Sequence, residues 1–192
     1  ITNDRLIIPL SIVVAGAIIA GAIVFVGGEN REQIADAGDA VPAKNEEAAG
    51  NIREVTSSDH ILGNIKTAEV FIVEFSDLEC PFCKSFHNTL KQVMEEYGPN
   101  GKVAWVYRHF PLNIHPKAIK EAEATECAAE LGGEVKFWEY TDRLFEITPS
   151  NNGLNLGLLS VIAEDVGLDQ KTFTACLDSG RHTKTVNEDL ED

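Results

Sequence analysis

The chain has 192 residues, and its 31 aspartates and glutamates outnumber its 16 lysines and arginines, so the formal net charge is −15. An acidic chain without a basic cluster cannot neutralise phosphates, which excludes a nucleic-acid-binding protein. Four cysteines allow two pairs, and the compartment decides whether such pairs are thiols or disulfides. The length suffices for one domain with its own core.

The first part of the chain is dominated by an uncharged apolar stretch at 7–26, which follows a short tail at 1–6. As a helix, this stretch would span roughly 30 Å, the hydrocarbon thickness of a bilayer. We therefore expect a single-pass anchor in the cell membrane, with a cleaved secretory signal as the alternative. Either interpretation places the following domain on the extracytoplasmic side. Positions 27–50 are acidic, rich in Gly and Ala and without apolar periodicity, which predicts a flexible linker.

The folded domain is expected to span 51–192 and to begin with a βαβ unit. Positions 70–75 form an apolar run typical of a central strand, and 103–110 are rich in aromatic and β-branched residues. Between them, apolar residues at helical spacing predict a helix from Cys80 to Tyr97. Strand, helix and strand within about 40 residues indicate parallel pairing with a right-handed crossover.

The segments on either side of this unit are predicted from turn residues and helical spacing. We expect a short edge strand at 52–55 and a turn at 58–63, in which His60 makes local hydrogen bonds. After residue 111, glycine- and proline-containing turns separate a series of helices. The expected helices span 116–131, 135–147, 156–166 and 169–177, with a last one after residue 180.

The motif Cys80-Pro81-Phe82-Cys83 directly follows the first strand and opens the predicted helix. This spacing lets two thiols face each other across the first helical turn and close a small disulfide. The helix N-terminus favours the thiolate of Cys80, the expected attacking thiol, and Pro81 suits the first turn. Cys83, one turn further and less exposed, is the expected resolving cysteine. A structural disulfide, an unreactive pair and a zinc knuckle are the alternatives. For a zinc knuckle, His87 lies nearby, but no second Cys/His pair follows at close spacing.

The segment from Val73 to Lys84 resembles the DsbA-like thioredoxin-fold proteins, the membrane-anchored kind that oxidise exported proteins. Positions 108–112 and 136–140 also look like segments of that family, and the resemblance covers about 51–192. It implies an α/β thioredoxin-like fold in which a helical insertion, here at about 116–178, follows the first βαβ unit.

Two departures from the family pattern affect the expected chemistry. The best-known members carry His where this chain has Phe82, so the disulfide is expected to be a milder oxidant. The family also packs a cis-proline loop against the cysteine pair, followed by further strands. No proline here precedes a late apolar strand, so we expect a C-terminally truncated sequence in which those strands are missing.

Three further side chains are assigned roles. The resemblance implies that Glu74 is a buried acid beneath the disulfide and that it shuttles the proton of Cys83. Burial would suit this role because it raises the pKa of a carboxyl. A solvated Glu74 is the alternative.

Cys127 and Cys176 lie on the inner faces of two expected helices. In an exported domain they predict a structural disulfide worth roughly 4 kcal/mol in the chain-entropy model, with two buried free thiols as the alternative.

The remaining aromatic and histidine side chains are expected to be structural. The expected core residues are Trp105, Phe137, Trp138 and Phe145. His109 and His115 flank the end of the second strand and are expected to support it rather than to catalyse. We expect no metal and no cofactor.

The sequence therefore predicts a membrane-tethered thiol–disulfide oxidoreductase that introduces disulfides into exported proteins through Cys80 and Cys83. The resemblance implies that a quinone-linked membrane enzyme reoxidises the pair. A reductase or isomerase stays open, because the direction of exchange depends on reduction potential and partner. A non-enzymatic thiol redox sensor is the second alternative.

Overall fold

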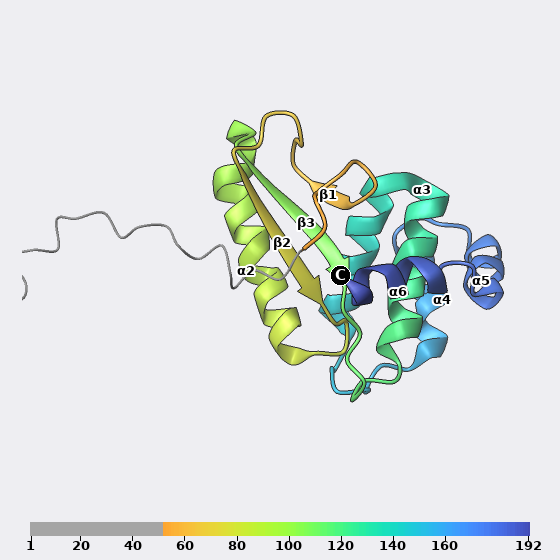
Figure 1. Cartoon of the computed structure of the whole chain (residues 1–192). Helices are drawn as coiled ribbons and strands as arrows, with labels where there is room; N and C mark the ends of the chain where they lie inside the picture. Colours follow the sequence, from red (N-terminus) through yellow and green to blue (C-terminus); the bar gives the residue numbers. More distant parts are fainter. Residues whose placement is uncertain (1–51) are drawn as a thin grey trace, which may run out of the picture. The chain divides into compact units, whose positions relative to one another are not determined.

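A computed structural model describes residues 52–192, which contain a three-stranded sheet, one helix beside it and a group of further helices (Figure 1). The predicted tail at 1–6, anchor at 7–26 and linker at 27–50 lie outside the described residues. Among residues 52–192, no helix is both long and apolar enough to cross a membrane.

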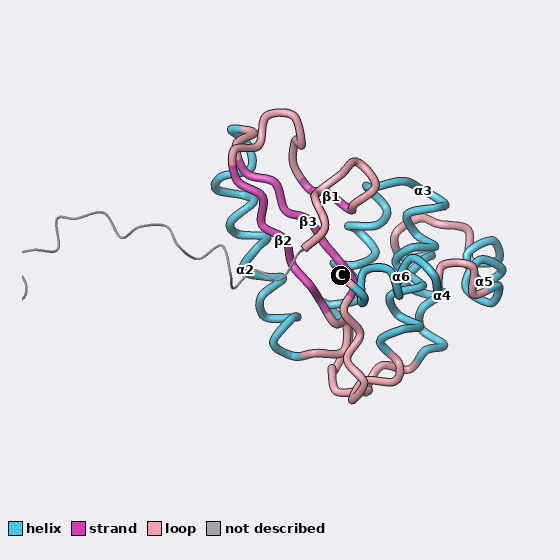
Figure 2. Tube along the Cα trace, in the orientation of Figure 1, coloured by secondary structure: helices cyan, strands magenta, loops and turns pink. Residues whose placement is uncertain are grey.

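The sheet has the strand order β1-β3-β2, formed by β1 (His60–Leu62), β2 (Val70–Ser76) and β3 (Val103–His109). β2 and β3 are parallel, with Ser76 opposite His109, whereas β1 runs antiparallel to β3. The predicted βαβ unit is therefore present. Because β2 and β3 end at the same edge, the loops that follow them gather there (Figure 2).

Two predictions for the start of the domain are wrong. Residues 52–55 form no strand, and the predicted turn at 58–63 contains β1 instead. The turn lies earlier, where the carboxylate of Asp59 accepts the N–H of Thr56 at 2.8 Å. A strand of three residues is too short to show alternation in the sequence, and its pairing partner β3 is distant along the chain.

The helices agree with the predicted pattern. α2 (Pro81–Tyr97) leads through a short 3₁₀ turn into β3. The later elements are α3 (Ala118–Ile147), η2 (Leu156–Leu158), α4 (Leu159–Asp165), α5 (Gln170–Ser179) and α6 (Thr183–Glu191). α3 was predicted as two helices, and it kinks at Gly133, whose φ of 71° and ψ of −170° interrupt the helical backbone.

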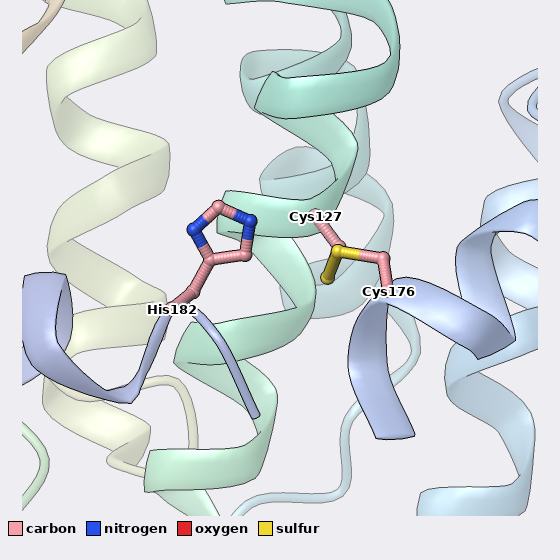
Figure 3. A group of neighbouring side chains, drawn as sticks. All are labelled: Cys127, Cys176 and His182. Atoms are coloured by element: carbon pink, nitrogen blue, oxygen red, sulfur yellow. A yellow bond between two sulfur atoms is a disulfide. The ribbon is translucent and has the colours of Figure 1, made fainter. Parts of the chain in front are cut away.

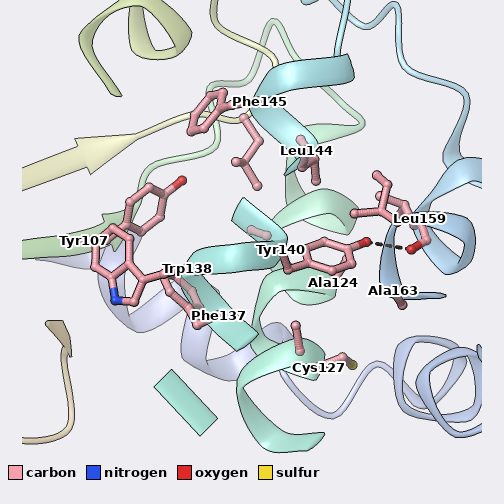
Figure 4. Packing of buried hydrophobic residues seen from close by; sticks show 14 of the residues in the cluster. Tyr107, Ala124, Cys127, Phe137, Trp138, Tyr140, Leu144, Phe145, Leu159 and Ala163 are labelled. Carbon is pink, nitrogen blue, oxygen red and sulfur yellow. Dashed lines mark hydrogen bonds between the residues drawn. The ribbon is translucent and has the colours of Figure 1, made fainter. Parts of the chain in front are cut away.

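The core lies between β3, α2 and the helices that follow (Figure 4). The ring of Trp105 contacts that of Trp138 at a centroid distance of 4.7 Å, and Tyr107 contacts Phe137 at 5.5 Å. The four predicted core aromatics are all buried. Tyr140 donates its hydroxyl to the carbonyl of Leu159 at 2.8 Å, which joins α3 to α4 and satisfies a buried polar group.

A buried arginine holds the two ends of the described chain against the sheet. Arg108 in β3 is fully buried and contacts Asp59 at 3.0 Å and Asp192 at 2.7 Å. Arg53 contacts the same Asp59 at 2.8 Å and Asp189 of α6 at 2.6 Å. Mutual pairing of this kind offsets the cost of removing the charges from water.

The sulfur atoms of Cys127 and Cys176 form a disulfide that joins α3 to α5 (Figure 3). The two residues are 49 positions apart, their Cα atoms are separated by 5.9 Å, and both are buried. The bridge therefore connects two helices within the predicted insertion.

Removing this bridge should destabilise the fold. We expect the double substitution Cys127→Ala and Cys176→Ala to lower the free energy of unfolding by roughly 2–5 kcal/mol, because the unfolded chain gains freedom. Urea denaturation of the oxidised wild type, the reduced wild type and the variant measures this effect. The reduced wild type controls for the cavity left by the lost sulfur atoms. A loss below about 1 kcal/mol relative to the oxidised protein would contradict a structural role.

Candidate active site

The two cysteines of the motif lie where β2 passes into α2. Cys80 is the N-cap residue, with φ of −81° and ψ of 122°, and Pro81 occupies the first turn. Both Cys80 and Cys83 are free thiols. The first N–H groups of a helix have no intrahelical partner, so this position favours a negatively charged sulfur.

The exposure of the two cysteines differs from the prediction. Cys80 is buried, with 8% of its surface exposed, whereas Cys83 is partly exposed. The expectation that Cys83 is the less exposed of the two is therefore wrong. The turn that carries Cys80 packs against the loop after α3, where the N–H of Asn151 donates to the carbonyl of Glu79 at 2.7 Å. That contact was not visible in the sequence.

The Cys83 thiol is held in its protonated form. Burial raises its pKa to about 11, and the neighbouring Cys80 sulfur acts in the same direction. The backbone of Asp77 and the side chain of Ser76 act in the opposite direction and lower this pKa. A thiol of high pKa does not initiate exchange at neutral pH, which suits the resolving role predicted for Cys83.

Glu74 is buried in β2, with 5% of its surface exposed. Its carboxylate accepts the Ser76 hydroxyl at 3.1 Å and the Trp105 indole N–H at 3.0 Å. Burial raises its pKa, although a nearby His87 charge and the two hydrogen bonds oppose this effect. The side chain of Ser76 also lowers the pKa of Cys83, so it affects both the acid and the dithiol. The proton shuttle by Glu74 stays a prediction.

Asp77 is a residue of the site that sequence reasoning missed. Its carboxylate accepts the N–H of Glu79 at 2.7 Å and that of Leu112 at 2.8 Å, and it contacts the Nδ1 of His115 at 2.8 Å. Its carbonyl accepts the N–H of Cys80 at 3.1 Å. Asp77 thereby joins the turn before Cys80 to the loop after β3. An aspartate three residues before a helix N-cap is a turn signal that could have indicated this.

A second unpredicted feature is a pair of buried carboxyls, Glu79 and Glu121, each with no exposed surface. One oxygen of Glu79 and both oxygens of Glu121 are buried without a donor. Burial raises the pKa of Glu121 to about 9, and the charges of Glu79 and Asp77 act in the same direction, while Lys117 opposes them.

Glu79 also joins the loop after α3 to the turn that carries the cysteine pair. The N–H of Leu154 donates to the carboxylate of Glu79 at 3.2 Å, and the Nζ of Lys117 donates to the Leu154 carbonyl at 2.6 Å. Residues 150–152 all have positive φ values. Such a run is costly for residues other than glycine and persists only where surrounding contacts hold it.

Exposed apolar side chains surround the first turns of α2 and the loop that Asp77 holds. Phe82 is 82% exposed and Phe86 49% exposed, although both lie on a helix whose inner face is buried. Ile114 in the loop after β3 is 72% exposed. Apolar surface next to a reactive pair is suited to an extended or unfolded polypeptide.

The raised pKa of Glu121 predicts a pH-dependent stability. In the folded state Glu121 keeps a proton that the unfolded state releases above about pH 4.3, so stability falls as pH rises towards about 9. The variant Glu121→Gln has no such proton. The difference in free energy of unfolding between this variant and the wild type should therefore shift in favour of the variant by up to about 1.4 kcal/mol per pH unit between pH 6 and pH 8.

Urea denaturation at pH 6, 7 and 8 measures this difference. The exposed Glu164 lies on α4, and Glu164→Gln provides the same chemical change outside the pair. The free energy of unfolding of Glu164→Gln should vary with pH in the same way as that of the wild type. If the stability of Glu121→Gln also varies with pH as that of the wild type does, Glu121 does not hold a proton in the folded state.

Comparisons with known proteins agree with this geometry. A family model described as "Thioredoxin" matches residues 55–192. The Na(+)/H(+) antiporter NhaA 3 of Salinispora tropica is 33% identical over 138 residues, which cover 69% of this chain and 19% of that protein. The antiporter NhaA 1 of Mycolicibacterium vanbaalenii is 39% identical over 89 residues, 46% of this chain and 14% of that protein. The chain thus spans less than a fifth of the length of these relatives.

Solved structures with a similar fold include DsbA proteins. DsbA2 of Pseudomonas aeruginosa is 27% identical, with a TM-score of 0.58 over 72% of this chain and 74% of that one. Oxidised BdbD of Bacillus subtilis is 25% identical, with a TM-score of 0.62 over 69% and 72%. DsbA of Chlamydia trachomatis, at 15% identity and a TM-score of 0.61 over 73% and 75%, shares the fold alone. The chain belongs to the thioredoxin family, and its fold is DsbA-like with a helical insertion.

Proposed function

We propose that the protein is a thiol–disulfide oxidoreductase that introduces disulfides into exported proteins. The observation that carries the proposal is the placement of Cys80 at the N-terminus of α2 with Cys83 one turn further. The two thiols have different surroundings, since Cys80 is buried at the helix N-cap, whereas Cys83 is partly exposed and has a pKa raised to about 11. Thiol–disulfide exchange requires one cysteine that reacts with the substrate and one that resolves the mixed disulfide, and this pair provides both.

The exchange starts from the oxidised form, in which Cys80 and Cys83 share a disulfide. A substrate thiolate attacks the Cys80 sulfur, so that a mixed disulfide forms and the bond to Cys83 breaks. The second substrate thiolate then attacks its own sulfur in the mixed disulfide and releases Cys80 as a thiolate. Two electrons pass from the substrate to the cysteine pair, and the substrate leaves with a disulfide.

The buried acid supports the first step. A thiolate of high pKa is a poor leaving group, so the departure of Cys83 is favoured when its sulfur receives a proton. Glu74 holds a proton more firmly than an exposed glutamate because burial raises its pKa. We assign protonated Glu74 as the proton donor to Cys83 through the Ser76 hydroxyl, whose oxygen lies 3.1 Å from the Glu74 carboxyl. In this relay the Glu74 proton passes to the Ser76 oxygen while the Ser76 hydrogen passes to the Cys83 sulfur.

The substrate, location and partner follow from the same proposal. The exposed Phe82 in the active-site dipeptide and the exposed Phe86 beside it suit unfolded exported chains. The Cys127–Cys176 bridge is consistent with an oxidising compartment. We therefore place the domain on the extracytoplasmic side, tethered to the cell membrane through residues 7–26. A quinone-linked membrane enzyme would take the two electrons and restore the disulfide.

A reductase or isomerase would use the same two cysteines in the opposite direction, and a redox sensor would use them with one partner. The reduction potential separates the first case. Oxidants of this fold lie near −120 mV and reductants near −270 mV. The range of proteins captured by Cys80 separates the second case.

The test is a trapping experiment with Cys83→Ser, which can form a mixed disulfide but cannot resolve it. Expressed as the full chain in cells, this variant should capture many exported proteins on Cys80, identified by mass spectrometry after non-reducing separation. The matched control Cys80→Ser should capture none, because its remaining thiol is held protonated. Capture of a single partner would overturn the oxidase proposal in favour of a sensor, and capture of none would overturn an exchange function.

A further inference from the structure

Three potential metal ligands converge on one point at the side of the sheet that faces α3. His60 comes from β1, His109 from the end of β3, and Glu126 from α3. Their exposure is low, and His109 has no exposed surface. The three side chains belong to segments that are far apart in the sequence but meet where the sheet contacts the helical insertion.

The distances suit a small divalent ion. The Nε2 of His60 lies 2.9 Å and the Nε2 of His109 lies 3.0 Å from the same Oε1 of Glu126. All three ligand atoms lie within 4.8 Å of one another. Ligands held about 2 Å from a tetrahedral zinc ion are separated by roughly 3.3 Å, so a small outward movement of each would admit the ion.

The surroundings of His60 match those of a metal-bound imidazole. Its second nitrogen, Nδ1, contacts Glu134 at 3.0 Å. A carboxylate in this position fixes the tautomer that leaves Nε2 free for a metal, and it raises the basicity of the ring. The ring also stacks on Phe137 at a centroid distance of 3.5 Å and an interplanar angle of 6°, which sets its orientation.

Without an ion, the Nε2 atoms of both imidazoles contact a single oxygen of Glu126. A divalent cation held between the three side chains would take the lone pairs of both Nε2 atoms and would neutralise the Glu126 carboxylate.

A cavity of about 430 Å³ gives the cluster access to solvent, and its lining includes His60, Glu126 and Tyr107. A water from this cavity could complete a fourth coordination position. Other charged groups of the lining are already paired, since Arg53 contacts both Asp59 and Asp189. Within the lining, His60 and Glu126 are thus the residues whose ligand atoms converge, together with the Nε2 of His109, on a common point.

A second group of potential ligands carries no such inference. The sulfur atoms of Cys127 and Cys176 lie close to His182 (Figure 3). They are bonded to each other, and a disulfide sulfur does not serve as a thiolate ligand.

We propose that His60, His109 and Glu126 bind one zinc ion, with water as the fourth ligand, and that the ion clamps the sheet to the helical insertion. The two imidazoles and one carboxylate are the ligand types that zinc takes at such distances. Glu134 positions His60 from outside the coordination sphere. The site is separate from Cys80 and Cys83, so it goes beyond the proposed exchange chemistry.

The test uses the full chain with Cys80→Ser and Cys83→Ser, because a free dithiol also binds zinc. Isothermal titration with zinc chloride should give one ion per chain. Cobalt(II) in its place should give visible d–d absorption without sulfur-to-cobalt charge transfer, as expected for nitrogen and oxygen ligands. Zinc should also raise the midpoint of thermal unfolding, because the ion binds the folded state.

Added His60→Gln or His109→Gln should abolish the zinc titration, whereas His182→Gln should leave it unchanged. Glu134→Gln should weaken affinity roughly 10–100-fold, as outer carboxylates do. Glu134 is exposed on the helix surface, so this variant is expected to fold, and Glu139→Gln on the same helix is its matched control. No binding by the dithiol-free chain, or binding unchanged by both histidine variants, would overturn the proposal.

Discussion

The carboxylate of Asp77 is the interaction on which the geometry of the dithiol depends. It receives hydrogen bonds from the turn, through Glu79, and from the loop after β3, through Leu112 and His115. Hydrogen bonds to a charged group contribute about 1.5–3 kcal/mol each, and here they are buried. The main chain of Asp77 also receives the N–H of Cys80 at 3.1 Å, so the same residue sets where α2 begins.

Further buried acids extend this arrangement around the cysteine pair. Glu79 joins the turn to the loop after α3, and burial raises the pKa of the neighbouring Glu121, which keeps that carboxyl protonated away from water. In β2, the buried Glu74 accepts the Ser76 hydroxyl at 3.1 Å. A buried carboxylate is costly unless donors surround it, so these residues constrain three loops at once. The exchange chemistry proposed for Cys80 therefore rests on a turn that is fixed from several directions.

Local patterns were enough to predict the βαβ unit, the helices after it and the position of the cysteine pair at a helix start. These features depend on spacing within short segments. The roles of Asp77 and Glu79 were not predicted, because their partners lie 35 and 75 residues away. The same reason explains His60, which was expected to bond locally but contacts Glu126 and Glu134 on α3. β1 escaped prediction because three residues carry no periodicity.

The most direct test of this account is the rate of thiol–disulfide exchange in Asp77→Asn. The reaction of the oxidised protein with a reduced two-cysteine peptide is followed by loss of free thiol, under conditions where circular dichroism shows a folded variant. The exposed Asp178 provides the matched control, Asp178→Asn. The account predicts a rate at least about tenfold lower in Asp77→Asn, equivalent to about 1.4 kcal/mol, and no change in the control. An unchanged rate in Asp77→Asn would contradict the claim that this carboxylate positions the reactive pair.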